Sequence, residues 1–220
     1  NDPSPRLSGT ADPNSFINVY NGATLIGSGQ ADGNGYWSFA PTVPLLDGNY
    51  SLTATAIDAA GNVSTPSPAF TFSIDTTRPD PITTLIVTDN EVPDIGIVPN
   101  GGSTNDTTPT FSGKVEPGAT VILYNGADIL ATIKADTSGN WSFTPAPLDQ
   151  GTYRITATVT DLAGNVSKAS AEFVLILDTA APTAAPTFTV SDNVDPKQDP
   201  ILNGDSTNDP TPTLTGTAEF

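Results

Sequence analysis

Carboxylates supply most of the side chains in this sequence that could do chemistry. The 220 residues contain 20 Asp and 4 Glu against 7 Lys and Arg, which gives a formal net charge of -17. They contain no His and no Cys, which excludes a Ser-His-Asp or Cys-His enzyme, disulfides and a Cys-based zinc site. The negative charge argues against a nucleic-acid partner, because phosphate binding needs clustered Lys and Arg. The remaining possibilities are hard-cation binding and paired-carboxylate catalysis.

The excess of Asp over Glu has two interpretations. Asp favours turns, caps and hard-cation sites, whereas Glu is a helix former. Turn formation and solubility account for part of the Asp residues. The others recur at fixed places in the chain, which directs attention to its organisation.

An internal repeat orders these carboxylates. Three segments open alike, with "NDPSPRLSGTADP" at Asn1, "NDTTPTFSGKVEP" at Asn105 and "NDPTPTLTGTAEF" at Asn208. Their starts are 104 and 103 residues apart, a period too long for a solenoid unit and typical of whole domains in tandem. We therefore expect a first repeat over 1–78, a second repeat over 79–180 and the start of a third repeat over 181–220.

Each repeat is expected to be all-β. Short β-rich runs alternate with clusters of Gly, Pro, Asn and Asp, and no segment shows helical apolar spacing. In the second repeat these runs predict seven strands, at 82–88, 108–114, 120–125, 128–134, 141–145, 152–160 and 171–177. Asn125-Gly126 predicts a tight hairpin whose positive-φ positions suit Asn and Gly. Seven short antiparallel strands in about 100 residues are typical of an Ig-like sandwich.

Alternating apolar residues predict the core. We interpret the aromatic residues as core rather than as a ligand platform. The predicted core of the second repeat contains Trp141, Phe143, Tyr153, Ile155, Val159, Phe173 and Leu175, with first-repeat counterparts Trp37, Phe39, Tyr50 and Phe72. The Gly-x-Tyr patterns "DGNY" and "QGTY" resemble a tyrosine corner.

An odd number of reversing strands predicts that the termini of a repeat lie at opposite poles, so that tandem copies join head to tail. The linkers "DTTRPDP" and "DTAAPTA" are short and contain Pro, which predicts a stiff rod of about 40 Å per domain. The pole of the second repeat that faces the first should carry Glu116, Asp136 and Asp161. The opposite pole should carry Asp89, Asn90, Asn105, Asp106, Asp149 and Asp178.

Carboxylates are therefore expected to converge where repeats join. Asp2 and Asp75 should approach the acidic loops of the second repeat, with Arg78 the only nearby cation. Like charges at ~4–6 Å repel, and a bound divalent cation would remove that cost. All-oxygen ligation is typical of Ca²⁺, so we predict Ca²⁺ sites here. Turn and cap formation is the alternative for the same Asp residues, and none matches the EF-hand spacing.

Several sequence signatures occur in the same order in both repeats. They resemble the bacterial Ig-like repeats of giant type I-secreted surface adhesins of the biofilm-associated and non-fimbrial kind. They are "NDTTPTFSGKVEPGATVILYNG", "ADTSGNWSFTP", "LDQGTYRITATVTDLAGNVS" and "LDTAAP". The resemblance implies an extracellular, Ca²⁺-stiffened stalk at the bacterial surface. It also implies metal ligands at Asp75 and Asp178, Asp58 and Asp161, Asp12 and Glu116, and Asp89, Asp106, Asp192 and Asp209. The copies depart from each other where Asp12 becomes Glu116, Asp94 becomes Lys197 and Gly102 becomes Asp205.

Three functions remain open at this stage. The first is a non-enzymatic stalk that contacts neighbouring repeats of its own chain, while other regions reach a host surface or biofilm matrix. The second is a module that itself binds a host glycan or protein. The third is an enzyme with paired carboxylates, for which small domains without a cleft are a poor setting. No apolar run approaches the ~20 residues of a membrane helix, so no membrane insertion is expected.

The chain begins at Asn1 without Met and reads as part of a longer polypeptide. The first repeat is then expected to lack its own first strand, and the third to contain only its first two. A further hypothesis is that strands within 181–220 complete the first repeat of another chain by β-augmentation.

Overall fold

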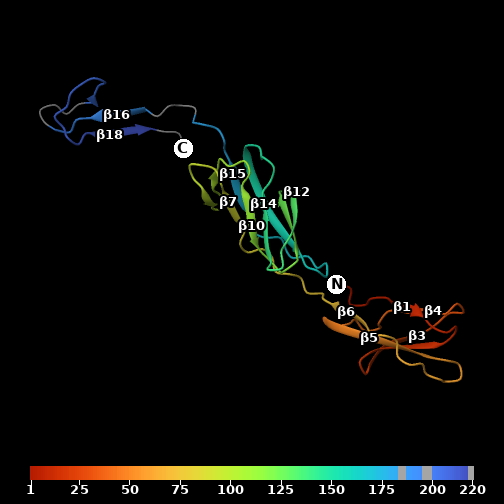
Figure 1. Ribbon diagram of the computed structural model, residues 1–220. Helices are drawn as coiled ribbons and strands as arrows, with labels where there is room; N and C mark the ends of the chain where they lie inside the picture. The colour runs from red at the N-terminus through yellow and green to blue at the C-terminus, as the bar shows by residue number, and fades with distance from the viewer. Residues whose placement is uncertain (183–186, 195–199, 218–220) are drawn as a thin grey trace. The chain divides into compact units, whose positions relative to one another are not determined.

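The chain consists of β-strands and loops throughout the described residues, which in this computed structural model are 1–182, 187–194 and 200–217 (Figure 1). Backbone contacts divide it into two units, 1–178 and 179–220. Within the described ranges no helix has the length and apolar character needed to cross a membrane. The expectation of an all-β chain is confirmed.

The second repeat is a sandwich of two sheets. One sheet has the strand order β13 (Asn140–Phe143), β10 (Thr110–Lys114), β7 (Ile86–Asp89), β8 (Gly96–Val98). The other has the order β12 (Asp128–Lys134), β11 (Thr120–Asn125), β14 (Gly151–Thr160), β15 (Phe173–Leu177), β9 (Ser103–Thr104). Neighbouring strands are antiparallel except β15 and β9, which are parallel.

All seven predicted strands of the second repeat are present, but the count of seven was wrong. The segment between β7 and β10 adds β8 and β9, one to each sheet. Both are very short and lie among Gly and Pro residues, so they lack the alternating run that identifies a strand from sequence. The parallel pairing of β9 also breaks the simple alternation of strand direction on which the pole assignment relied.

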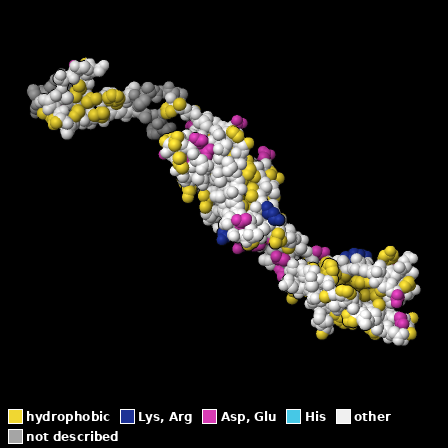
Figure 2. Space-filling view, in the orientation of Figure 1, with side chains coloured by type: hydrophobic (Ala, Val, Ile, Leu, Met, Phe, Trp, Pro, Cys, Tyr) yellow, Lys and Arg dark blue, Asp and Glu magenta, His cyan; other side chains and the backbone are white. Residues whose placement is uncertain are grey.

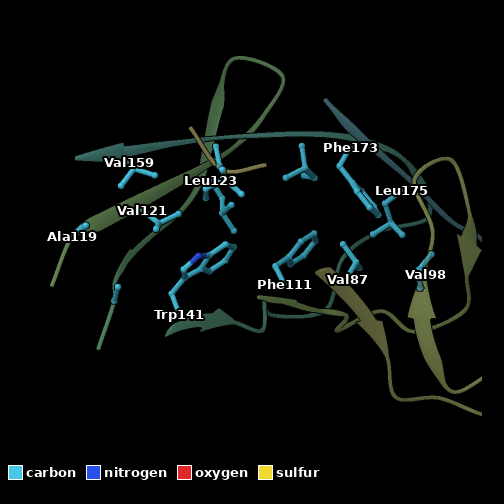
Figure 3. Packing of buried hydrophobic residues seen from close by; sticks show 14 residues of the cluster. Val87, Val98, Phe111, Ala119, Val121, Leu123, Trp141, Val159, Phe173 and Leu175 are labelled. Carbon is cyan, nitrogen blue, oxygen red and sulfur yellow. The ribbon is translucent and has the colours of Figure 1, made fainter. Parts of the chain in front are cut away.

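The core of the second repeat lies between its two sheets (Figure 3). Trp141 and Phe111 project from one sheet towards Val121 and Leu123 of the other, and Val87 lies between Phe111 and Val98 in this layer. Five of the seven predicted core residues are buried, namely Trp141, Ile155, Val159, Phe173 and Leu175. The other two, Phe143 and Tyr153, are partly buried and pack against the cluster.

The tyrosine corner is confirmed in both repeats. The Tyr153 hydroxyl donates a hydrogen bond of 2.7 Å to the carbonyl oxygen of Asp149, four residues upstream. Tyr50 makes the same bond to Leu46 at 2.9 Å. Burial raises the pKa of the Tyr153 hydroxyl, and the nearby Asp149 charge adds to the effect. The bond fixes the loop that leads into β14.

The predicted hairpin after β11 exists, although its turn residues differ from the prediction. Asn125 is still in the strand, where it pairs with Asp128, and only Gly126 adopts a positive φ, of 60°. The Asn125 side-chain oxygen accepts the Arg154 N–H at 2.9 Å. Asn is therefore present for a cross-strand hydrogen bond rather than for backbone freedom.

The first repeat has fewer strands. One sheet contains only β1 (Leu7–Thr10) and β4 (Tyr36–Phe39). The other has the order β3 (Thr24–Gln30), β2 (Phe16–Asn21), β5 (Gly48–Ile57), β6 (Phe70–Ile74). The described sheets of the first repeat contain no counterparts of β7, β8 and β9, whose equivalent positions would precede Asn1.

The unit 179–220 contains a three-stranded sheet with the order β17 (Pro200–Ile201), β16 (Thr187–Ser191), β18 (Thr213–Thr217). Its strands repeat the arrangement of β8, β7 and β10 in the second repeat. The two predicted strands are thus present, with β17 in addition. The change of Asp94 to Lys197 lies outside the described residues.

Candidate functional site at the junction of the repeats

Three of the predicted ligand residues close tight turns with their own carboxylates. Asp161 accepts the main-chain N–H of Asn165 at 2.8 Å on one oxygen and the Asn165 side-chain amide at 2.8 Å on the other. The same pair of bonds joins Asp58 to Asn62 and Asp136 to Asn140. Each Asn follows a Gly with a φ of 84° to 89°, which a residue with a Cβ adopts only at a cost.

These hydrogen bonds also hold the carboxylates ionised. The Asn62 side chain and main chain lower the pKa of Asp58, and the main-chain N–H groups of Asn140 and Ser138 lower that of Asp136. For Asp161, burial acts to raise the pKa, but the bonds from Asn165 outweigh it and the pKa lies below its ordinary value. Neutral donors therefore stabilise these charges without a cation.

The loop that contains Asp161 contacts both the linker and the start of the chain. The Asn165 amide that reaches Asp161 also donates to the carbonyl oxygen of Asp75 at 2.9 Å. The Asn1 main-chain nitrogen lies 3.2 Å from the Ala163 carbonyl oxygen, and its side-chain amide 3.1 Å from that of Gly164. Asn165 is only 8% exposed. These three contacts across the junction are N–H groups that donate to main-chain carbonyl oxygens.

The other predicted junction residues do not join this group. Asp2 accepts the Ser4 N–H at 2.8 Å, and Asp75 accepts the Thr77 N–H at 3.0 Å, so both carboxylates face their own neighbours in the chain. Asp12 and Glu116 are exposed. Nowhere in the described part of the chain do three or more acidic side chains form a group that could hold a metal ion. The expected cluster of converging carboxylates is not assembled.

The loop between β7 and β10 contains a second carboxylate arrangement, which is buried. Asp89 is 2% exposed and accepts the Thr104 hydroxyl at 2.5 Å and the Glu91 N–H at 2.7 Å. Asp106 is 1% exposed and accepts the N–H groups of Asn90 and Thr108 at 3.0 and 2.7 Å. Thr104 links the two, because its hydroxyl also accepts the Asp106 N–H.

The third repeat reproduces this arrangement residue for residue. Asp192 accepts the Thr207 hydroxyl at 2.6 Å, and Asp209 accepts the Asn193 N–H at 2.9 Å. The N–H groups of Asn193 and Thr211 lower the pKa of Asp209. The buried Asp-Thr-Asp network is therefore a structural element of the fold.

Asn105 and Asp178 lie next to this network in the second repeat. The exposed Asn105 donates to the Val92 carbonyl at 2.9 Å. The Asp178 N–H donates to the Thr104 carbonyl at 2.9 Å, which places the linker after β15 beside the loop, as the pole assignment predicted.

Sequence reasoning missed two residues that organise the first linker. Asn165 joins the repeats, and its recurrence in "DAAGN" and "DLAGN" was the available signal. Asp47 accepts the Thr76 N–H and hydroxyl and the Thr77 hydroxyl at 2.8 to 2.9 Å. The hydroxyl bonds from Thr76 and then Thr77 are the main reasons that the pKa of Asp47 is lowered.

The fold, the repeat and the turns identify the class. Residues 1–76 and 82–179 match the bacterial Ig-like domain family, and the chain belongs to that family. These matched segments follow one another in the chain, so each repeat has another repeat of the same family as its neighbour.

Known proteins with similar sequence or fold include an enzyme and two adhesins. Exoglucanase B of Cellulomonas fimi is 33% identical over 177 residues, which is 76% of this chain and 14% of that protein. A Ca²⁺-stabilized adhesin that helps an Antarctic bacterium reach out and bind ice is 23% identical, with a TM-score of 0.41 over 85% of this chain and 46% of that one. A tetra-tandem repeat from the extending region of a large adhesion protein is 17% identical, with a TM-score of 0.35 over 98% and 59%.

Proposed function

We propose that this chain is a structural spacer, part of the stalk of a large bacterial adhesin at the extracellular cell surface. It supports cell adhesion or biofilm formation by extending other regions and performs no catalysis itself. The match to only 14% of an exoglucanase supports a module that accompanies domains of other functions. The observation that carries the proposal is the contact between the linker and the next repeat, where Asn165 binds the Asp75 carbonyl.

The aromatic residues that pack in the cores favour a spacer over direct ligand recognition, whereas Phe16, Tyr36 and Phe70 of the first repeat are exposed. Trp141 is buried, Tyr153 is used in its corner, and Tyr50 stacks on Phe72 with ring centroids 5.4 Å apart. A glycan or protein site would use exposed aromatic or basic side chains instead. Binding to a glycan array in Ca²⁺-containing buffer would contradict the spacer function.

We further propose that Ca²⁺ binds at the junction, with Asp75 and Asp161 as its carboxylate ligands. On binding, Asp75 would turn from the Thr77 N–H, and Asp161 would release a bond from Asn165. The carbonyl oxygens of Asp75, Ala163 and Gly164 face the junction and accept N–H donors there. Oxygen-only ligands of this type suit Ca²⁺, although the described residues offer fewer than three grouped acids. The oxygen ligands fit Ca²⁺. Because Ca²⁺ takes 6–8 oxygen ligands and the proposed site has two carboxylates, main-chain oxygens must complete it.

Calorimetry tests the calcium proposal. Titration of the full chain with Ca²⁺ should show a site with a Kd of about 10⁻⁴–10⁻³ M, which Asp75→Ala with Asp161→Ala removes. Asp128→Ala is the matched control, since Asp128 is an exposed hairpin residue of β12. Absence of binding at millimolar Ca²⁺, or equal loss in the control, would contradict the proposed site.

A further inference from the structure

The last strand of the second repeat has a parallel neighbour. Strand β15 lies beside β9 with Ile176 opposite Ser103, whereas its other neighbour, β14, is antiparallel to it. The chain leaves the repeat at Asp178, directly after β15, so a pull on the linker that follows acts on β15 first. The two neighbours of β15 therefore decide how the repeat resists tension along the chain.

Hydrogen bonds join the segments 100–104 and 172–178 beyond the short pairing of β9 with β15. Asn100 begins this ladder, because its side-chain oxygen accepts the Val174 N–H at 2.7 Å and its amide donates to the Glu172 carbonyl oxygen at 3.2 Å. Main-chain bonds of 2.8 to 3.0 Å continue it, namely Gly101 N–H to the Val174 carbonyl, Ile176 N–H to that of Gly102 and Asp178 N–H to that of Thr104. We call this ladder the clamp.

The ends of three strands meet at one pole of the second repeat, which we call the exit pole. The Thr104 hydroxyl at the end of β9 donates to the Asp89 carboxylate at the end of β7. The Thr104 carbonyl accepts the Asp178 N–H directly after β15. The opposite pole carries Asn165, which binds the first linker at Asp75. Strands β7, β9 and β15 therefore all run towards the exit pole, and tension between the two linkers pulls β7 and β15 in opposite directions along their axes.

Hydrogen-bonded strands transmit this tension between the poles. Figure 2 shows charged side chains towards the ends of the second repeat and few along the middle of its visible face. Strand β7 is held by three residue pairs with β10, and β8 pairs only with β7 within the described sheets. When these short strands detach, the pull reaches β9 from its start and β15 from its end. The clamp then lies directly between the two pulled points.

We propose that the second repeat is a load-bearing module whose resistance to tension is set by the clamp between 100–104 and 172–178. Because β9 and β15 are pulled apart along parallel axes, the bonds of the clamp stretch together, whereas a ladder pulled from one end opens one bond at a time. The biological use of this resistance rests on the proposed stalk function. The resistance itself belongs to the fold, so a weak clamp would leave the spacer function standing.

Optical tweezers measure this resistance on the full chain. The chain has no Cys, so DNA handles can be attached at Asp80→Cys and Ala181→Cys, exposed positions on either side of the second repeat. Unfolding of 81–180 should lengthen the chain by roughly 300 Å, at about 3.3–3.6 Å per residue less the folded length, which identifies the event. The quantity compared is the unfolding rate at constant force, because forced unfolding is governed by that rate.

Asn100→Ala removes the side-chain bonds of the clamp. Asn125→Ala is the matched control, because the Asn125 side-chain oxygen also accepts a main-chain N–H, that of Arg154 at 2.9 Å, but between β11 and β14. At the same force we expect Asn100→Ala to unfold at least about fivefold faster than the unchanged chain, and Asn125→Ala to stay within about twofold of it. Equal unfolding rates of the two variants would overturn the proposal.

A second direction of pull separates the clamp from ordinary stability. Strands β11 and β15 run the same way, because both are antiparallel to β14, so the hairpin at Asp128 lies towards the exit pole. Handles at Asp128→Cys and Ala181→Cys therefore peel β15 from Asp178 onwards, and Asn100 lies at the far end of the clamp. The unchanged chain should unfold at a lower force in this geometry, and Asn100→Ala should match it within about twofold. Equal forces in the two geometries, or equal acceleration of Asn100→Ala in both, would overturn the proposal.

Discussion

At the scale of single residues, neutral donors stabilise most of the described carboxylates in the loops. Arg154 and Glu172 form an ion pair at 2.7 Å. The Asp residues elsewhere accept N–H and O–H groups, as Asp161 does from Asn165 and Asp89 from Thr104. The excess of Asp over Glu therefore reflects, in these turns, a side chain short enough to reach its own backbone.

The buried Asp106 carboxylate should be important for stability. Asp106→Ala leaves the N–H groups of Asn90 and Thr108 without their acceptor. Because both bonds are part-buried, we expect a total loss of about 1–3 kcal/mol. Urea unfolding monitored by Trp fluorescence measures the loss. Asp128→Ala, at an exposed residue of the hairpin after β11, should change the free energy of unfolding little, and an equal change in the two variants would contradict the structural role of the network.

Asn165 should order the linker without being needed for folding. Asn165→Ala removes the bond to the Asp75 carbonyl, and a hydrogen bond of about 1 kcal/mol corresponds to about fivefold faster hydrogen exchange. We expect that increase in the linker segment 75–82. Asn62→Ala is the control, because Asn62 makes the same bonds to Asp58 but is exposed. Unchanged exchange in Asn165→Ala would show that the bond does not order the linker.

The turn carboxylates predict an acid-sensitive fold. The pKa values of Asp58, Asp136 and Asp161 lie below the ordinary value of 3.8, so their stabilising contribution is present above about pH 3.8 and is lost as the pH falls through the folded-state pKa. Urea midpoints should therefore drop between about pH 5 and about pH 2. Asp136→Asn, which cannot titrate, should show a shallower drop, and a drop identical to that of the unchanged chain would contradict the contribution of Asp136.

At the scale of elements, close contacts fix the turns between strands. Gly139, before β13, has a φ of 84°, and a Cβ there would collide with the Val115 carbonyl oxygen. Gly126, after β11, has a φ of 60° with open space around it. The two glycines therefore separate the effect of backbone strain from that of a steric contact.

Alanine at these two glycines should have unequal effects. Gly126→Ala should cost ~1–2 kcal/mol from the left-handed conformation alone. Gly139→Ala should cost clearly more, since the backbone near Val115 must also move. Urea unfolding monitored by Trp fluorescence, to which Trp37 and Trp141 both contribute, compares the two, and equal losses would argue against the contact.

The sequence predicts elements with their own alternating pattern and fails for those that depend on tertiary pairing. The strands β11, β12 and β14 follow from apolar and β-branched runs, and the predicted ranges agree within one residue. The strands β8 and β9 were missed because two or three residues among Gly and Pro become strands only by pairing with β7 and β15. Asp161 was found as a junction residue, but Asn165 was not, because its role requires the Asp75 carbonyl 90 residues away.

At the scale of the whole molecule, repetition provides an internal comparison. The second repeat, with β7, β8 and β9 in place, buries Phe173, whereas the first repeat leaves the equivalent Phe70 exposed. Asn165 binds the Asp75 carbonyl and is 8% exposed, whereas Asn62, in the equivalent turn of the first repeat, is exposed.

The proposed stalk function requires that the junction between the first and second repeats becomes stiffer when Ca²⁺ binds. The chain has no native Cys, so spin labels can be placed at Ser51→Cys and Thr152→Cys, both exposed positions. Pulsed electron–electron double resonance between them measures the distance between the first and second repeats. Asp75→Ala with Asp161→Ala tests the proposed ligands, and Asp58→Ala, at the equivalent turn of the first repeat, is the control.

The width of this distance distribution tests the proposed calcium-stiffened junction most directly. We expect it to narrow when about 1–10 mM Ca²⁺ replaces chelator, to narrow equally in Asp58→Ala, and to stay broad in the double variant. A distribution of the same width in Ca²⁺ and in chelator would contradict the calcium-stiffened junction.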